Sequence, residues 1–242
     1  MTIETDCFFL DDPIETEIGE CHFIRVRQYP KLARSLNLIS WSKSQVIYNF
    51  HKLNKDGSLT ELIDQLKPLK LHEIARLLPE LNDAYTLIFK EVFKDESVLN
   101  KIDENNFDAI RSLILKMSGV KEEVIIPNLE IQEARERSKR VKAQQNGGVI
   151  DFSDMASSIV SLSSHTYRDL PELTLYQFYQ LYYRIAQIKA YDTTTLFATV
   201  PSEKKAEIED WSKHIDLFKE ESHSISKEQM NTQAQGLFGN RQ

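Results

Sequence analysis

The residues best suited to chemistry are spread along the chain instead of being grouped. The six histidines stand at positions 22, 51, 72, 165, 214 and 223. His72 with Glu73 begins the pattern that holds zinc from one helix face, but the second histidine of that pattern is missing. Adjacent carboxylates such as Glu122 and Glu123 point in different directions on a helix, so they do not form an acid and base pair by themselves. Ordinary surface or core positions are the simpler interpretation.

The two cysteines, Cys7 and Cys21, have no histidine partner that their spacing assigns. His22 alone does not complete the paired spacing of a zinc site, and we expect free thiols that behave as apolar side chains. Only seven glycines are present, with no glycine-rich phosphate loop and no GxSxG elbow. We predict no catalytic, cofactor-binding or metal-binding residues and a protein that is not an enzyme, although distant residues can assemble a triad.

The composition predicts a soluble, helix-rich protein. A chain of 242 residues with 41% hydrophobic residues can bury the core of one or two domains. The mean hydropathy is −0.42, and no apolar run approaches the roughly 18 residues of a membrane span. The start, MTIETDCFFLDD, lacks the basic and apolar regions of a signal peptide. We therefore expect a cytoplasmic protein, and its net charge of −7 argues against a general nucleic-acid binder.

The first 28 residues read as extended chain, unlike those that follow. The segments 5–10 and 18–28 have strand-like patterns, with a turn at Asp11, Asp12 and Pro13 between them. We predict a β-hairpin. Because two strands alone are only marginally stable in water, the hairpin must pack on the following helices or pair with another subunit.

The chain from Pro30 onward has the apolar periodicity of short helices. One apolar stripe runs from Leu32 to Phe50, and Ser58 with Glu61 forms a capping-box pattern for the next helix. Further helices are predicted at 71–78, 82–93 and 106–117, with Gly119 as the stop of the last. The predicted fold class is mainly α: an N-terminal β-hairpin and a compact array of short helices in a domain at 1–132.

The composition changes between Gln132 and Gly148. Five basic residues and two acidic ones lie between Glu133 and Lys142, with almost nothing apolar, so a solvated helix and a flexible linker are expected at 133–150. A smaller helical module is predicted at 151–220. Its helices are capped by Asp151 or Ser153 and by Thr174 with Gln177. A charged amphipathic helix is predicted at 203–218, and a disordered tail at 221–242.

The helix that follows Thr174 is unusually aromatic. Six aromatic residues lie between Tyr176 and Tyr191. They form two rows, and one helix face cannot hold both. The helix is therefore buried on two sides, or its second row is a docking surface for another chain.

The aromatic segment, with its core DM…LTLYQFYQLYYRI, resembles the C-terminal part of tail assembly chaperones from long-tailed bacteriophages and related prophages. The earlier segment IGECHFIRVRQYPKLARSLNLIS is similar, more loosely, to their N-terminal part. The resemblance implies a non-enzymatic chaperone that binds the tape measure protein and helps to recruit tail tube subunits. It also implies the host cytoplasm as location, absence from the mature virion and no cofactor.

We predict that Tyr176, Tyr179 and Tyr183 contact the partner, with Phe178 and Tyr182 in the core, although all five could be core residues. Self-association is possible through the N-terminal part, and a membrane partner is not expected. Two alternatives stay open. One is a helical nucleic-acid-binding or regulatory protein that uses the basic segment 135–142, and the other is a structural component of the virion or tail.

Overall fold

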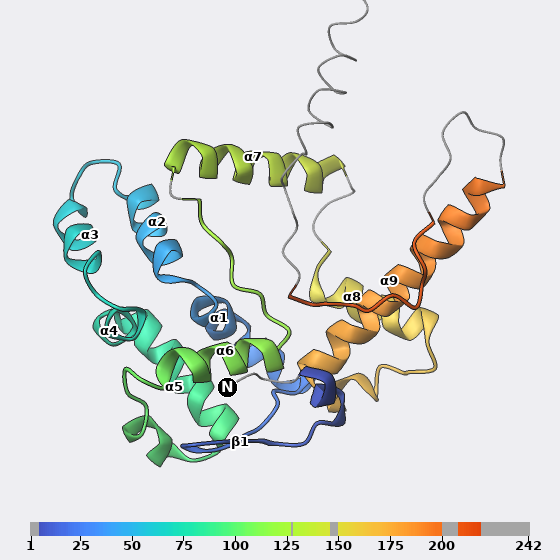
Figure 1. Cartoon of the computed structure of the whole chain (residues 1–242), viewed down its shortest axis with the longest axis horizontal. Coiled ribbons are helices and arrows are strands. Elements are labelled where there is room, and N and C mark those ends of the chain that lie inside the picture. The colour runs from blue at the N-terminus through green and yellow to red at the C-terminus, as the bar shows by residue number, and fades with distance from the viewer. Residues whose placement is uncertain (1–4, 127, 146–149, 200–207, 219–242) are drawn as a thin grey trace, which may run out of the picture.

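The computed structural model describes residues 5–126, 128–145, 150–199 and 208–218, and it confirms a mainly helical fold with a short N-terminal hairpin (Figure 1). The strands are β1 (Ile14–Thr16) and β2 (Gly19–Cys21). The helices of the N-terminal region are α1 (Tyr29–Ile39), α2 (Lys43–Leu53), α3 (Thr60–Leu66), α4 (Leu71–Leu77), α5 (Pro79–Phe93) and α6 (Phe107–Met117). They are followed by α7 (Leu129–Gln145), α8 (Phe152–Leu162) and α9 (Leu175–Ala198).

The hairpin is shorter than predicted. The two strands pair antiparallel with Ile14 opposite Cys21. The predicted first strand is wrong, because residues Thr5–Leu10 form a 3-10 helix. This turn directs Phe8 into the core, where its ring meets the rings of Phe23 and Tyr176 edge-on. The contact with Tyr176 lies far along the chain, so local strand propensity did not predict it.

The predicted stripe from Leu32 to Phe50 is divided between α1 and α2. The Ser42 hydroxyl accepts a hydrogen bond from the Gln45 amide and starts the second helix. The guanidinium of Arg111, itself buried, donates to the carbonyls of Ile39, Ser40 and Trp41 at 2.8, 3.1 and 3.1 Å. These bonds satisfy the carbonyls left free at the end of α1.

The predicted capping box at Ser58 is also wrong. The Ser58 hydroxyl donates to the Asp56 carboxylate, and α3 begins at Thr60 with Leu59 as its N-cap. By contrast, α6 ends as predicted, with Gly119 at φ +63°. The Ser58 capping box fails because the hydroxyl bonds to the Asp56 carboxylate in the preceding turn instead of to a helix amide.

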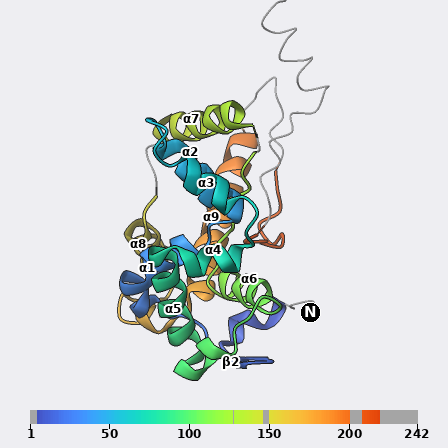
Figure 2. The ribbon, with the colours of Figure 1, turned by 90° about the vertical axis from the view of Figure 1, so that its left-hand side faces the viewer.

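Helix α5 supplies the centre of the main core. It packs against α1 and α4, and Figures 1 and 2 show α2 and α3 above it. The amide of His22 donates to the Val92 carbonyl, so the chain after β2 is fixed to the same helix. The buried side chains of α5 are Leu81, Ala84, Tyr85, Ile88, Phe89, Val92 and Phe93.

The C-terminal helices are joined to this core by the backbone. The Val26 amide donates to the Leu173 carbonyl, and the Leu175 amide donates to the Ile24 carbonyl, both at 2.9 Å. These bonds form an antiparallel bridge between Arg25 and Thr174. Leu175 is fully buried in the main core directly after the bridge. The first turn of α9 therefore belongs to the N-terminal core.

The two predicted caps of the C-terminal helices are present. The Asp151 carboxylate accepts from the Asp154 amide at the start of α8, in a capping box. Thr174 and Gln177 form the capping box that opens α9. The predicted boundary near 148 lies outside the described residues.

Helix α7 confirms the prediction of a polar helix, and it is tied to the body by charged groups. Lys52 of α2 pairs with Glu136 at 2.9 Å, and Lys139 pairs with Glu123 at 2.6 Å. Arg135 donates to the Val124 carbonyl at 2.8 Å. No apolar face is needed to place this helix.

The predicted helix at 203–218 is wrong for its described part. Residues 208–218 contain turns and no helix, and they run along α9 as a strap (Figure 1). The Asp210 carboxylate accepts bonds from the amide and hydroxyl of Ser212, and this turn replaces the helix. The predicted tail at 221–242 lies outside the described residues. Among the described helices, none is long and apolar enough to cross a membrane.

The buried Arg111 provides a test of the fold. We expect Arg111→Met to lower the free energy of unfolding by about 3 kcal/mol, because several buried carbonyls lose charged donors. Arg34→Met is the control, since Arg34 is exposed and pairs with Glu80 at 3.4 Å. That variant should change stability by less than about 0.5 kcal/mol. Urea unfolding followed by circular dichroism measures both, and equal losses would contradict the role of Arg111.

The two thiols provide a second test. Burial raises the pKa of Cys21 from 9.0 to about 12, whereas Cys7 is exposed. At pH 8, iodoacetamide should therefore modify one thiol of the native chain and two in denaturant, as counted by mass spectrometry. The thiol of Cys21 also stabilises the fold below pH 9, and this contribution is lost as pH rises from 9 towards 12. Rapid modification of Cys21 in the native chain would show that the hairpin is not packed as described.

Candidate protein-binding surface

Helix α9 has three faces with different surroundings. One face packs against α8, a second carries the strap, and a third is covered only at the start of the helix. Burial falls along the helix: Leu175 and Phe178 are fully buried, whereas Leu196 and Phe197 are 68% and 65% exposed. Figure 1 shows the C-terminal end of α9 at the edge of the molecule.

The face towards α8 holds a small second core. Phe178 and Ile159 are fully buried there, beside the buried Leu170. Phe152 stacks on Phe178 with 4.3 Å between ring centroids, and Tyr182 packs against the same cluster. Offset aromatic pairs of this kind contribute about 1 kcal/mol beyond the area they bury. This core fixes the angle at which α9 leaves the N-terminal region.

The third face begins in the core and ends in solvent. Its first member, Tyr179, is half-buried, and its ring lies against Gly119 and Phe152. Burial raises the pKa of the Tyr179 phenol far above its usual value, with Tyr29 contributing. Beyond this point the residues at helical spacing are all exposed, and they carry no charge: Tyr183, Ala186, Ala190, Thr193 and Phe197. We call these five residues the open face.

The geometry of the open face suits a helical partner. Tyr183 and Phe197 are 14 residues apart, a span of about 21 Å along the helix axis. Ala186 and Ala190 lie between them, and their small side chains allow another backbone to approach closely. The Tyr183 ring is held edge-on by Tyr182, with 5.4 Å between centroids. A rigid aromatic beside small residues gives contact area with few rotors to immobilise.

The predicted contact residues lie at different depths. Tyr176 is buried in the main core against Phe8, and Tyr179 is half-buried against Gly119. Tyr183 is 44% exposed on the open face. The structure thus does not bring the three tyrosines together on one surface. Phe178 lies in the core, as predicted.

Sequence reasoning missed the remaining members of the open face. Ala186, Ala190 and Phe197 follow Tyr179 and Tyr183 at intervals of three, four and seven residues. That spacing was visible in the sequence. The aromatic density drew attention to the first half of the helix, whereas the surface lies in the second half.

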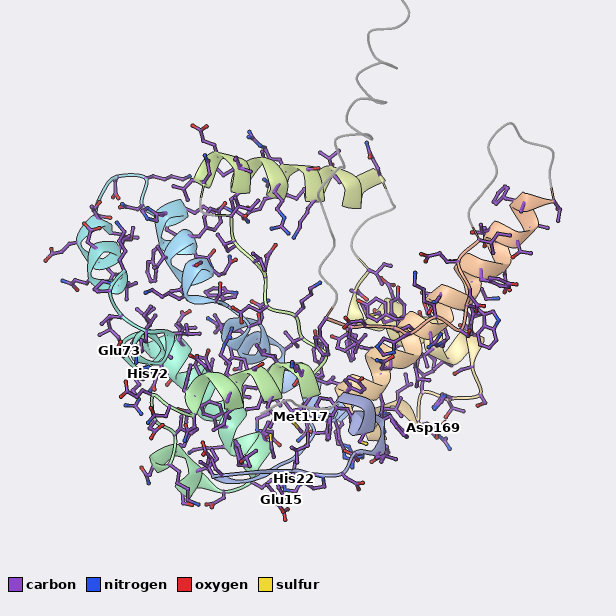
Figure 3. The ribbon with its side chains drawn as sticks, in the orientation of Figure 1. Glu15, His22, His72, Glu73, Met117 and Asp169 are labelled. Carbon is purple, nitrogen blue, oxygen red and sulfur yellow. The ribbon has the colours of Figure 1, made fainter. Side chains whose placement is uncertain are left out.

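The groups considered for chemistry are dispersed. Figure 3 shows His72 and Glu73 on α4, far from His22 and Glu15 at the hairpin. Within the described residues, no three histidine, cysteine, aspartate or glutamate side chains are grouped so as to hold a metal ion. The basic helix is partly neutralised by its own contacts, since Arg135 and Lys139 are bonded to residues 120–126.

Comparison with known proteins places the chain in a family. A model described as the YomV N-terminal domain matches residues 3–127, and a model described as the YomV second domain matches residues 141–216. The chain belongs to the YomV family. The SPbeta prophage-derived uncharacterized protein YomV of Bacillus subtilis strain 168 is 39% identical over 235 residues, covering 97% of this chain and 98% of the relative. No solved structure gives a significant match.

The open face lies entirely within the second matched region, since residues 141–216 include α9 and most of the strap. Gly119, which packs on Tyr179 at the start of the same helix face, lies in the first matched region. The relative's prophage origin confirms the phage-related part of the resemblance. The name of the relative states no tail assembly role.

The contact between Gly119 and Tyr179 provides a test of how α9 is positioned. A methyl group added at Gly119 would lie 2.7 Å from the Tyr179 ring, and φ there is +63°. Gly57→Ala is the matched control, because φ is +81° but nothing lies within 4 Å. Both variants should lose about 1 kcal/mol from backbone strain, and Gly119→Ala at least about 1 kcal/mol more from overpacking.

Thermal and urea unfolding of the two glycine variants measure this difference. Nuclear magnetic resonance shifts of the Tyr179 ring should change only in Gly119→Ala. Equal destabilisation of the two variants would mean that Tyr179 does not rest on the end of α6.

Proposed function

We propose that this chain is a tail assembly chaperone whose open face on α9 binds a helical segment of the tape measure protein. The observation that carries the proposal is the uncharged row from Tyr183 to Phe197, exposed on a helix that is fixed at its other end. Soluble proteins bury most large apolar rows, and those left exposed commonly mark interaction sites. The resemblance to tail assembly chaperones and the prophage origin of the relative support the choice of client.

The physical task explains the architecture. A tape measure protein is long and helical, and its apolar stripe must be covered reversibly until tube subunits assemble around it. A helix laid against the open face would place its stripe on Ala186 and Ala190, with Tyr183 and Phe197 at the ends. Tube subunits would then be recruited to the client while the chaperone holds it. The chain acts without catalysis or cofactor, in the host cytoplasm, and leaves before the virion is complete.

The two alternatives predict different results. A nucleic-acid-binding protein would use residues 135–142, and its binding would weaken steeply with salt. The ties of Arg135 and Lys139 to residues 120–126 weigh against this use. A structural tail component would be present in purified particles in fixed ratio, and mass spectrometry of particles separates that case from a chaperone.

Co-expression tests the chaperone directly. The full chain is produced with the neighbouring long helical reading frame, and the soluble fraction of the client and its co-purification are measured. We expect the client to be soluble only with the chaperone. Ala186→Lys combined with Ala190→Lys should reduce the soluble client at least tenfold, because two charges would be desolvated in the contact.

The control for this experiment is Asp192→Lys, on the same helix but outside the open face. Asp192 is exposed and pairs with Lys189 at 3.8 Å on the same helix. This variant should leave client solubility unchanged. A client that is equally soluble alone, or with the double lysine variant, would refute the proposal.

A further inference from the structure

Side chains of α9 donate hydrogen bonds to main-chain carbonyls of the strap. Arg184 donates to the carbonyls of Trp211 and Lys213 at 2.6 and 3.1 Å. Gln187 donates to the Asp210 carbonyl at 3.2 Å, and Gln180 to the Ile215 carbonyl at 3.5 Å. The three donors lie at i, i+4 and i+7, so they form one row along the helix.

The order of these contacts shows how the strap runs. As the helix number falls from 187 to 180, the strap number rises from 210 to 215, so the two segments are antiparallel. The row spans about 10 Å of helix. Gln187 also accepts from Arg184, which orients the guanidinium towards the strap. The row is therefore preorganised for carbonyl oxygens on a passing chain.

The strap's side chains contribute unequally. Leu217 and Phe218 are half-buried and pack against the main core. Ile215, whose carbonyl accepts from Gln180, is also half-buried, whereas Ile208 and Trp211 are 46% and 48% exposed. Main-chain carbonyls carry no sequence information, so selectivity resides in the half-buried apolar side chains, chiefly the adjacent Leu217 and Phe218 that pack against the main core.

We propose that the row formed by Gln180, Arg184 and Gln187 is a second peptide-docking site, occupied in cis by the strap. Its occupant in trans is an extended segment of a client that presents main-chain carbonyls followed by an apolar–aromatic pair like Leu217–Phe218. The strap is thus a replaceable cover that keeps this face of α9 closed until a client segment displaces it. The site lies on a different face from the open face, and its client is the one assigned under the proposed function.

The physical basis of the exchange is competition. A tethered segment competes at an effective concentration on the order of millimolar, so a free peptide binds weakly while the strap is in place. Weakening the strap at its apolar pair, without touching the row, removes this competition. The apparent affinity for a peptide should then rise at least tenfold.

The test uses the full 242-residue chain and a fluorescent synthetic peptide with the sequence of residues 208–218, IEDWSKHIDLF. Fluorescence anisotropy measures binding to the wild type and to a strap-release variant, Leu217→Ser with Phe218→Ser. We expect at least tenfold tighter binding to the release variant. Adding Gln180→Ala and Arg184→Ala to it should remove that gain, whereas Lys189→Ala, an exposed position outside the row, should preserve it.

Two altered peptides test which apolar side chains of the strap contribute to binding. A peptide with serine in place of Ile208 and Trp211 should bind as well as the original. A peptide with serine in place of the Leu–Phe pair should bind at least tenfold more weakly. Protection of Cys21 from alkylation verifies that each protein variant is folded.

The possible outcomes decide the proposal. Equal peptide binding by wild type and release variant, or binding that ignores Arg184, would overturn it. Dimerisation of the release variant alone, seen by size exclusion, would show that a second copy's strap takes the row and would also overturn it. Peptide exchange combined with a client whose solubility does not depend on the chain would support the docking row and refute the chaperone function.

Discussion

The structure depends on the backbone pairing of Ile24–Val26 with Leu173–Leu175. Two hydrogen bonds of 2.9 Å join segments that are far apart in the chain. Each backbone group at such a buried junction must find a partner, and here each segment supplies what the other lacks. Directly after the pairing, Leu175 enters the main core and the capping box of Thr174 starts α9. The aromatic helix is thus positioned by the N-terminal region from its first residue.

Attachment at one end explains the gradient of burial along α9. The first two turns serve two cores: Leu175 and Tyr176 the main one, and Phe178 the smaller one with α8. Gly119 limits the approach of Tyr179 on one side. Farther along, the described part of the chain offers no packing partner on the third face, and aromatic and small residues are exposed there. The aromatic residues at the start of α9 therefore pack in the two cores, whereas those towards its end are exposed.

The sequence predicted what local chemistry decides. The caps at Asp151 and Thr174 and the stop at Gly119 depend on a few neighbouring residues, and they were found. The break between α1 and α2 was missed although Ser42 supplies a local cap for α2, and the carbonyls at the end of α1 are satisfied by Arg111 of α6. The 3-10 turn of Phe8 was missed because its ring packs on Tyr176.

The surface was predicted only in part, for the same reason. Tyr183 was chosen from its aromatic character, but which helix face lacks a neighbour is a property of the whole fold. The strap was predicted as a helix because its apolar residues have helical spacing. In the structure the side chains of Arg184 and Gln187 bind its carbonyls and replace the intrahelical bonds. A segment's own pattern cannot show that another element satisfies its main chain.

The pairing of the two chain halves also has a consequence during protein synthesis. Arg25 bonds to the Glu172 carbonyl across 147 residues, so the edge at Ile24–Val26 is made long before its partner. At about 5 to 20 residues per second, a ribosome needs roughly 7 to 30 seconds to synthesise that interval. Throughout this time the N-terminal core lacks Leu175 and Tyr176, and its edge at residues 24–26 lacks its partner. The N-terminal core is therefore completed by the first turn of α9, which is synthesised long after the rest of that core.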